Sequence, residues 1–405
     1  MYILMLFCLS YIPMLYKQMR ISSNVVLPIY IYSVFSFIYV FFTNLYLVTE
    51  STVVNIKMEL LDVEHANLML VFVLATNVIL YLSLMFLPNK ISNPILQGKI
   101  DLATNLGNFS KYLFFIIYPA TLVLVVLFPW PIFGEEVTLF NSIAAFSKTI
   151  LLVVFCSLSL VRRSGDINKV VFFCVFLLLM ILNFIDTART QLFVAVFVYL
   201  FAERITLAGL LKRFYFSIAF LLFFVYLTLA RSNIDFNFEL LLWPFYSEAI
   251  FGSYGALQAV EIVKSGLWEV TSPVYYFLDF IEGLLPSIIS EAINYESYLS
   301  RMVEASHAKG LFEGKLYPLG GNFFVSDYLI YFGLLGPIFF SGFLLTYAYF
   351  ISKLPAELYV FCISSFFFVV KASLIVLVKT IILAGMAYLL FLFFYTVMPK
   401  KIKVR

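Results

Sequence analysis

Charge is scarce in this chain of 405 residues. Asp, Glu, Lys and Arg together make up 12% of it, whereas hydrophobic residues make up 63%. A typical soluble domain carries about 25% charged residues, and the mean hydropathy of +1.02 is equally far from a soluble chain. The composition therefore predicts an integral membrane protein, organised as a single membrane domain over residues 1–405.

Histidine is rarer still, and familiar cofactor signatures are missing. His65 and His307 are the two histidines, which excludes a site built from several histidines, although a carboxylate site for a divalent cation stays open. The sequence has no P-loop motif, no dinucleotide-binding glycine signature and no H-E-x-x-H zinc motif. We expect no metal and no cofactor, and ATP-driven transport loses support.

Cysteine is also sparse, and each cysteine falls inside an apolar run. These four residues are Cys8, Cys156, Cys174 and Cys362. A disulfide or a thiolate metal ligand is not expected inside a membrane span, so the cysteines do not indicate a redox compartment.

Long apolar runs are what the sequence has in abundance. They are gapless and rich in Phe, Leu, Ile and Val, unlike the alternating segments of about 10 residues in an outer-membrane barrel. Helices satisfy their own backbone hydrogen bonds in lipid, so the sequence predicts an all-α, polytopic protein with about eleven transmembrane helices. The expected spans are Tyr2–Tyr16, Val25–Val48, Leu68–Leu87, Leu113–Phe133, Ala144–Val161, Val170–Ile185, Gln191–Ala202, Phe214–Ala230, Phe324–Ile351, Ala356–Val370 and Ile381–Val397.

The distribution of basic residues predicts the orientation. If the first span starts outside, most Lys and Arg residues fall on one side, including the C-terminal KKIKVR, while most acidic residues fall on the other. By the positive-inside rule the basic side is cytoplasmic. The N-terminus is then expected outside, and residues 231–323 form one large extracytoplasmic loop that carries short helices. The net charge of +3 reflects this asymmetry, so no nucleic-acid partner is needed to explain it.

Two arginines are predicted at the outer boundary, where the positive-inside rule disfavours them. Arg189 lies in DTARTQ, and Arg231 lies in LARSN at the start of the loop. A guanidinium there suits a phosphate or pyrophosphate headgroup. The alternatives are a local ion pair of Arg189 with Asp186 and ordinary lipid contacts of Arg231.

The second half of the loop gathers polar residues in SYLSRMVEASHAKGLFEGKLYPLGGNFF. Within it, His307 can exchange a proton near neutral pH, and a carboxylate such as Glu304 can orient it. Arg301 and Tyr317 lie in the same interval. The alternative is a solvated histidine. Aromatic residues along the loop, Tyr275 and Tyr276 among them, suit either sugar rings or an interfacial belt, and the belt is favoured.

The exit of the loop, PLGGNFFVSDYLIYFGLLG, is the most specific segment. A glycine pair lets the backbone turn, Asn322 and Asp327 stand near the span entrance, and Tyr328, Tyr331 and Gly333 follow in a helix. In this pattern the chain resembles the Wzy-like O-antigen and capsular polysaccharide polymerases. In part of that family ten residues separate an arginine from a glycine. The chain departs from this spacing, because the corresponding position is Leu242 counted from Arg231 and Phe312 counted from Arg301.

The resemblance implies a glycosyltransferase of the bacterial inner membrane that polymerises polyprenyl-pyrophosphate-linked oligosaccharide repeat units on its outer face. A chain-length regulator protein is a further partner that the family suggests. We expect His307, Arg301 and Glu304 to be catalytic. We expect substrate to be bound by Arg189, Arg231, Tyr317, Asn322 and Asp327.

Three other functions fit part of the pattern. A repeat-unit flippase would show a pseudo-repeat and more charges within its spans, neither of which is apparent. An O-antigen ligase shares the long loop and differs in its acceptor. A structural or chain-length-regulating protein would have far fewer spans.

Overall fold

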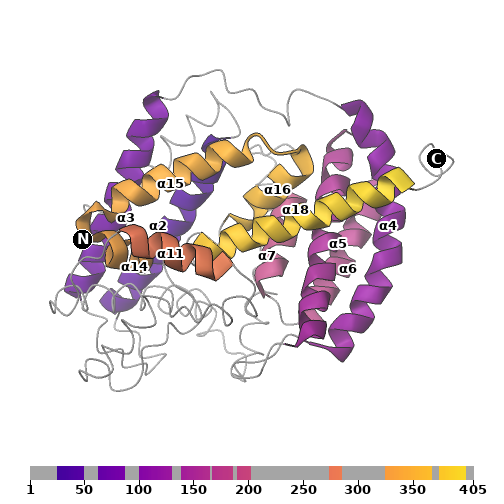
Figure 1. Ribbon diagram of the computed structural model, residues 1–405, viewed down its shortest axis with the longest axis horizontal. Coiled ribbons are helices and arrows are strands. Elements are labelled where there is room, and N and C mark those ends of the chain that lie inside the picture. The colour runs from indigo at the N-terminus through magenta and orange to yellow at the C-terminus, as the bar shows by residue number, and fades with distance from the viewer. Residues whose placement is uncertain are drawn as a thin grey trace. The chain divides into compact units, whose positions relative to one another are not determined.

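The described part of the chain is built of helices. The computed structural model describes residues 25–49, 63–86, 100–129, 138–164, 167–185, 189–201, 273–284, 324–366 and 374–397, and every regular element in these ranges is helical (Figure 1). Within them, six helices are long and apolar enough to cross a membrane. The prediction of an all-α protein is thus confirmed for the described residues, and six of their helices could span a membrane. The predicted spans Tyr2–Tyr16 and Phe214–Ala230 lie outside the described residues.

The contacts divide the chain into two compact units. The first comprises Met1–Ser92, Glu239–Phe350 and Phe366–Lys379, and the second comprises Asn93–Phe238, Ile351–Ser365 and Thr380–Arg405.

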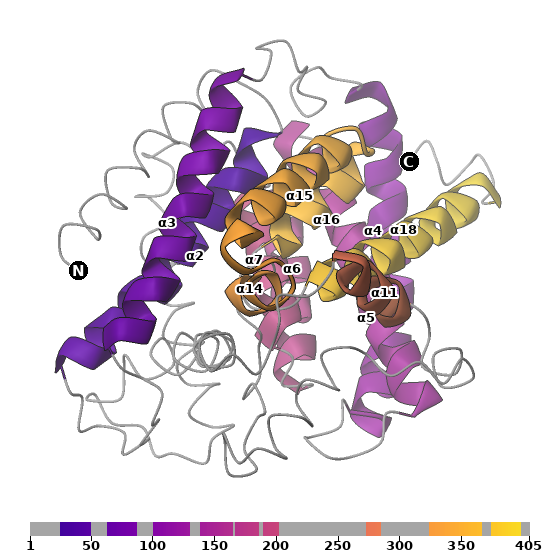
Figure 2. The same cartoon turned by 60° about the vertical axis from the view of Figure 1, so that its left-hand side comes forward.

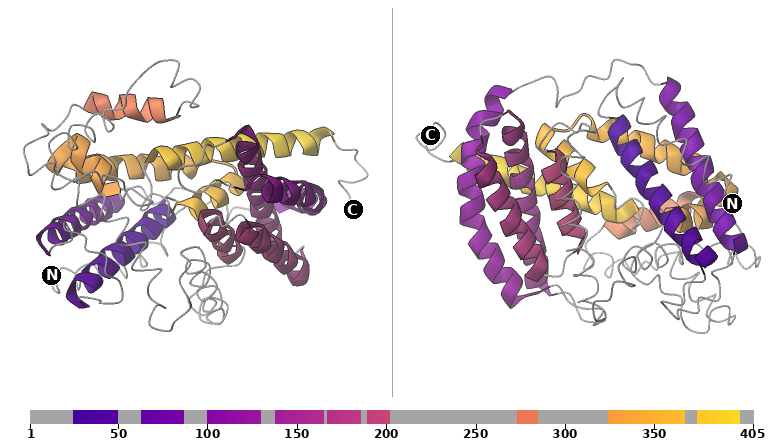
Figure 3. Two further views of the ribbon diagram at one scale, coloured as in Figure 1. Left: turned by 90° about the horizontal axis from the view of Figure 1, so that it is seen from below. Right: turned by 180° about the vertical axis from the view of Figure 1, so that it is seen from behind.

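The first unit pairs two long helices with a broken third one. Its helices are α2 (Val26–Thr49), α3 (Val63–Phe86), α11 (Pro273–Leu284), α14 (Phe324–Phe332), the 3-10 turn η2 (Gly333–Leu335) and α15 (Gly336–Ile351). Helices α2 and α3 lie side by side (Figures 1 and 2), joined by a hydrogen bond of 2.8 Å from Ser33 Oγ to Asn77 Oδ1. Helices α14 and α15 lie between this pair and α11 (Figure 3, left).

The span predicted over Phe324–Ile351 is among the six candidates, as Tyr328–Ile351, but a three-residue turn interrupts its helix. Gly333 has a φ of 55°, a left-handed conformation that favours glycine, and it opens the three-residue turn η2. Pro337 follows as the second residue of α15, where its missing N–H costs little. The glycine and the proline thus end α14 and start α15 as separate helices.

The second unit is a helical bundle around α5. Its elements are α4 (Ile100–Leu127), α5 (Leu139–Ser164), α6 (Lys169–Ile185), α7 (Arg189–Phe201), α16 (Ala356–Ser365) and most of α18 (Leu374–Val397). Helix α4 packs along α5, and α16 contacts both α5 and α7 (Figure 3, right). Ser110 Oγ donates a 3.0 Å hydrogen bond to Ser157 Oγ, linking α4 to α5. Such small polar pairs link packed helices in membranes.

Local side chains fix where α5 begins. The Thr138 backbone N–H donates to Asn141 Oδ1 at 2.8 Å, and the Asn141 N–H donates back to Thr138 Oγ1 at 3.3 Å. This reciprocal pair is a capping box, which satisfies donors that the first helical turn leaves open. Asn141 Nδ2 also donates to the Pro129 carbonyl at 2.7 Å, which ties the start of α5 to the end of α4.

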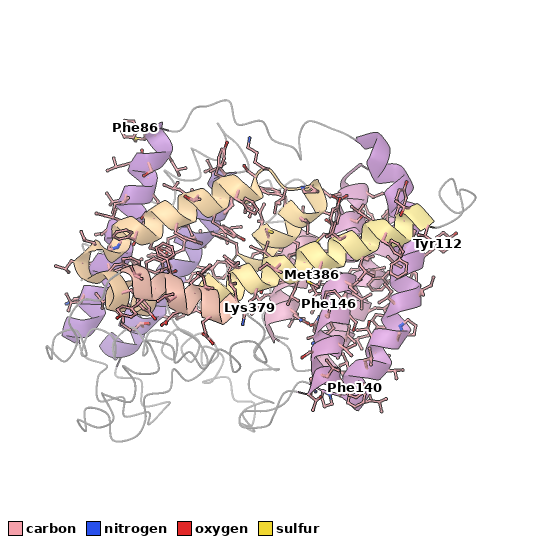
Figure 4. The ribbon with its side chains drawn as sticks, in the orientation of Figure 1. Phe86, Tyr112, Phe140, Phe146, Lys379 and Met386 are labelled. Atoms are coloured by element: carbon pink, nitrogen blue, oxygen red, sulfur yellow. The ribbon has the colours of Figure 1, made fainter. Side chains whose placement is uncertain are left out.

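Large apolar side chains cover the outer sides of the long helices. Phe86, Tyr112, Phe140 and Met386, labelled in Figure 4, are each half exposed or more. Water solvates such a surface poorly, whereas lipid chains match it in polarity. The exposed residues are therefore those expected of helices that face lipid.

Candidate functional site

Helix α11 turns its polar side inward. Tyr276 and Asp279 are three residues apart and so lie on one face of the helix. Asp279 is only 6% exposed, and Tyr276 is buried with it. They meet Tyr328 and Tyr331 of α14, which are also three residues apart and buried. We call these four residues the tyrosine–aspartate cluster.

Two hydrogen bonds join the helices of the cluster. The hydroxyl oxygens of Tyr276 and Tyr328 lie 2.9 Å apart, and the Tyr331 hydroxyl donates to Asp279 Oδ2. Each bond joins residues 52 positions apart in the sequence. From the first bond to the second, the chain moves three residues forward in both helices. Helices α11 and α14 therefore run in the same direction at this contact.

Aromatic rings enclose the hydroxyl groups. The Tyr276 ring centroid lies 5.2 Å from those of both Tyr331 and Phe332, edge to face in each case. Tyr328 meets the ring of Phe340 edge-on at 4.9 Å, and Phe340 lies 5.3 Å from Tyr32 of α2. Each favourable ring pair contributes about 0.5 to 1.5 kcal/mol beyond its buried area. The rings hold α11 in a defined position on α14.

Asp279 carries the carboxyl group of the cluster. Burying an ionisable side chain in apolar surroundings costs free energy unless the side chain is hydrogen bonded. Tyr331 supplies one such bond and thereby orients the carboxylate. An oriented carboxylate can accept a hydrogen bond, or a proton, from a hydroxyl of a ligand.

Most residues predicted from sequence as a site lie outside the described residues. These are Arg231, Arg301, Glu304, His307, Tyr317 and Asn322. The backbones of two others are described: Arg189 is the first residue of α7, and Asp327 is the fourth residue of α14, directly before Tyr328 of the cluster. Arg189 and Asp327 belong to different units. The roles predicted for all eight residues stay predictions.

Sequence reasoning overlooked Asp279. The segment PVYYFLDFIEGL does contain a signal, because Asp279 follows a tyrosine by three positions in a largely apolar helix. Its partner Tyr331 was placed correctly in a helix at the loop exit. The pairing of the two across 52 residues could not be inferred from either segment alone.

Buried amide oxygens flank Arg189 in the chain. Asn183 Oδ1 near the end of α6 and Gln191 Oε1 near the start of α7 lack a hydrogen-bond partner among the described residues. Asn183 Nδ2 is bonded to the Leu179 carbonyl at 2.8 Å. Buried acceptors are normally satisfied, so both oxygens are suited to a hydroxyl or N–H donor from outside the described helices.

A second charged group is buried inside α5. Lys148 is 4% exposed and lies within the apolar stretch Leu139–Arg162. Ionisable residues inside spans mark substrate paths or ion pairs.

Among the described residues, His, Cys, Asp and Glu form no group of three that could hold a metal ion.

Comparisons with protein-family models, with curated proteins and with solved structures find no match to this chain. The family resemblance therefore rests on the sequence motifs, and the site rests on its own geometry.

Proposed function

We propose that this protein polymerises polyprenyl-pyrophosphate-linked oligosaccharide repeat units on the outer face of a bacterial inner membrane. The single structural observation that supports this is the buried Asp279 carboxylate, which Tyr331 holds against the helix that follows the proposed outer loop. A hydroxyl-binding carboxylate is what transfer to a sugar hydroxyl requires.

The proposal includes the finer topology. About eleven spans would cross the bilayer, with the N-terminus outside and the C-terminus in the cytoplasm. Residues 231–323 would then form the extracytoplasmic loop, and α11 would be one of its short helices. The cluster of α11 and α14 would stand where this loop re-enters the membrane.

The reaction needs little covalent chemistry from the protein. A hydroxyl at the nonreducing end of the incoming repeat unit forms a bond to the anomeric carbon of the growing chain. The bond from that carbon to the pyrophosphate breaks, and polyprenyl pyrophosphate leaves. The hydroxyl proton passes to a base, and the negative charge of the leaving group needs cationic partners.

The roles divide between two sets of side chains. Arg189 and Arg231 bind the donor pyrophosphate, since planar guanidinium groups match phosphate oxygens, and Arg301 assists them. His307 or Glu304 serves as the base, and Asp279 joins them as a third candidate because its carboxylate is oriented. The remaining residues, Tyr317, Asn322 and Asp327, would contact the saccharide.

A deletion strain complemented with variants tests this function. With the wild-type chain, long surface polymer should return. If Asp279 is the base, and not His307 or Glu304, Asp279→Asn should leave one repeat unit per surface acceptor, because the amide cannot accept the proton; long polymer from this variant would exclude Asp279 as the base. Glu282→Gln, on the same helix but outside the cluster, is the matched control and should restore the polymer. Membrane insertion of each variant is verified first.

The deletion strain alone separates the rival functions. Single capped repeat units at the surface indicate a polymerase. Repeat units held at the cytoplasmic face indicate a flippase, and full-length polymer retained on its carrier indicates a ligase. Either of the last two results would overturn the proposal.

The arginine and histidine roles have their own variants. Long polymer from Arg189→Ala or Arg231→Ala would exclude the pyrophosphate clamp. A wild-type ladder from His307→Ala would exclude that residue as the base and leave Glu304 and Asp279.

A further inference from the structure

Helix α11 has an inverted distribution of polarity. The side that packs on α14 carries the carboxylate and a tyrosine hydroxyl, whereas the opposite side is apolar and exposed. Val274, Phe277 and Ile281 are 60%, 59% and 55% exposed, and Leu278 between them is exposed as well. These positions recur every three to four residues, so they form one continuous stripe. A helix that faces water places its polar residues outward.

The contacts of α11 also fix its depth. Its partners Tyr328, Tyr331 and Phe332 are all among the first five residues of the apolar stretch Tyr328–Ile351. Helix α11 therefore lies beside the end of a candidate span. With 12 residues its length is about 18 Å, too short for a hydrocarbon core of about 30 Å.

The span beside α11 also exposes apolar side chains. Tyr276, on the packed side of α11, contacts the buried Phe332 ring, which stacks on Phe339 with 4.4 Å between centroids. Phe339 and Ile338 are themselves exposed on α15. The span against which α11 packs thus has an apolar exposed side of its own, as expected of a lipid-facing helix.

We propose that α11 is an interfacial helix whose stripe, formed by Val274, Phe277, Leu278 and Ile281, is immersed in the outer lipid of the bilayer. The stripe contacts lipid at the boundary between headgroups and acyl chains, where helices of this type lie in the membrane plane. The inference does not depend on the proposed reaction. It places Asp279 at the level where the headgroup of any lipid-linked substrate would be found.

Spin labels report the environment of the stripe directly. The native cysteines are replaced by alanine, and single cysteines are introduced at Val274, Phe277, Leu278 and Ile281 of the full chain in phospholipid vesicles. Each is labelled with a nitroxide, and its collision rates with oxygen and with a water-soluble nickel chelate are measured. A label at Glu282, part-exposed on another side of α11, is the control. A variant that retains Cys174, exposed on α6, as its single cysteine is the lipid reference.

We expect the collision ratio to depend on the side of α11 that carries the label. The ratio of oxygen to nickel collisions should be several-fold higher at the four stripe positions than at Glu282, and should approach the ratio at Cys174. Frequent nickel collisions on the stripe would show that it faces water. Low rates with both reagents would show that another segment or a second copy covers it. Either outcome overturns the proposal.

A measurement on the unmodified chain guards against variants that do not fold. The wild-type protein is reconstituted with a phospholipid that carries a photoactivated carbene precursor in its acyl chain, and labelled peptides are mapped by mass spectrometry. Labels should appear in Pro273–Leu284, at Phe277 or Ile281. Labelling confined to long helices such as α4 would contradict the interfacial placement.

Discussion

Replacing Gly336 with alanine should destabilise the first unit. Gly336 begins α15 where this helix approaches α3 and the end of α14. A Cβ atom at this position would lie 2.6 Å from Phe72 Cζ and 2.9 Å from the Tyr328 carbonyl oxygen. Phe72 is buried, and a backbone oxygen can shift only with its helix, so neither neighbour yields easily.

The size of the effect follows from two opposing contributions. Overpacking a filled interior costs about 1 to 3 kcal/mol, while glycine to alanine in a helix gains about 0.5 to 1 kcal/mol. At Gly342, on the same helix, a Cβ atom would meet no other atom within 4 Å, so Gly342→Ala retains the gain alone. The two variants should thus differ by about 1 to 3 kcal/mol in the free energy of unfolding.

Unfolding of the purified protein by sodium dodecyl sulfate, followed by circular dichroism, measures this difference. Gly336→Ala should unfold at a lower mole fraction of sodium dodecyl sulfate than the wild type. Gly342→Ala should unfold at the same or a higher mole fraction. Adding Phe72→Leu to Gly336→Ala should recover part of the loss, because the shorter side chain removes one of the two clashes. Equal midpoints for Gly336→Ala and Gly342→Ala would refute the close packing of α3 and α15.

Three further predictions concern single hydrogen bonds. Tyr331→Phe should reduce polymer length in complemented cells and lower stability by about 1 to 3 kcal/mol, since Asp279 loses a donor; wild-type behaviour in both assays would contradict the role of this bond. Ser110→Ala and Ser157→Ala should show a coupling of about 0.6 kcal/mol in a double-mutant cycle, and additive effects would exclude the bond between them. Thr138→Ala should cost about 1 kcal/mol through loss of the α5 cap, whereas Thr138→Ser should not; equal stabilities would argue against capping.

The long helices could be predicted from sequence because lipid imposes a simple rule. A run of about 20 apolar residues is long enough to cross the hydrocarbon core, and the run predicted over Val25–Val48 forms α2 at Val26–Thr49. The helix ends were predicted less accurately than the helices themselves. Helix α4 begins at Ile100, well before the expected Leu113, because a helix continues beyond the apolar part of its sequence.

The break at Gly333 shows a limit of hydropathy. The residues on both sides are apolar, so the pattern predicts an unbroken span over Phe324–Ile351. Gly333 has a left-handed backbone conformation and opens the 3-10 turn that separates the two helices. This conformation does not change the hydropathy of the segment.

The candidate site was partly accessible from sequence. The exit motif directed attention to Tyr328 and Tyr331, which both belong to the tyrosine–aspartate cluster. Asp279 was not identified, because its burial depends on a contact between segments far apart in the chain. Residues such as His307 and Arg231 lie outside the described residues, so their assignment depends on chemistry and resemblance alone.

Chain growth by the purified protein tests the proposed function most directly. The protein is reconstituted in vesicles with a polyprenyl-pyrophosphate-linked repeat unit as the sole substrate, and the products are resolved by size and by mass. The account predicts a ladder of lipid-linked oligomers, with one polyprenyl pyrophosphate released for each new linkage. Unchanged substrate with folded wild-type protein, or transfer only after another acceptor is supplied, would contradict it.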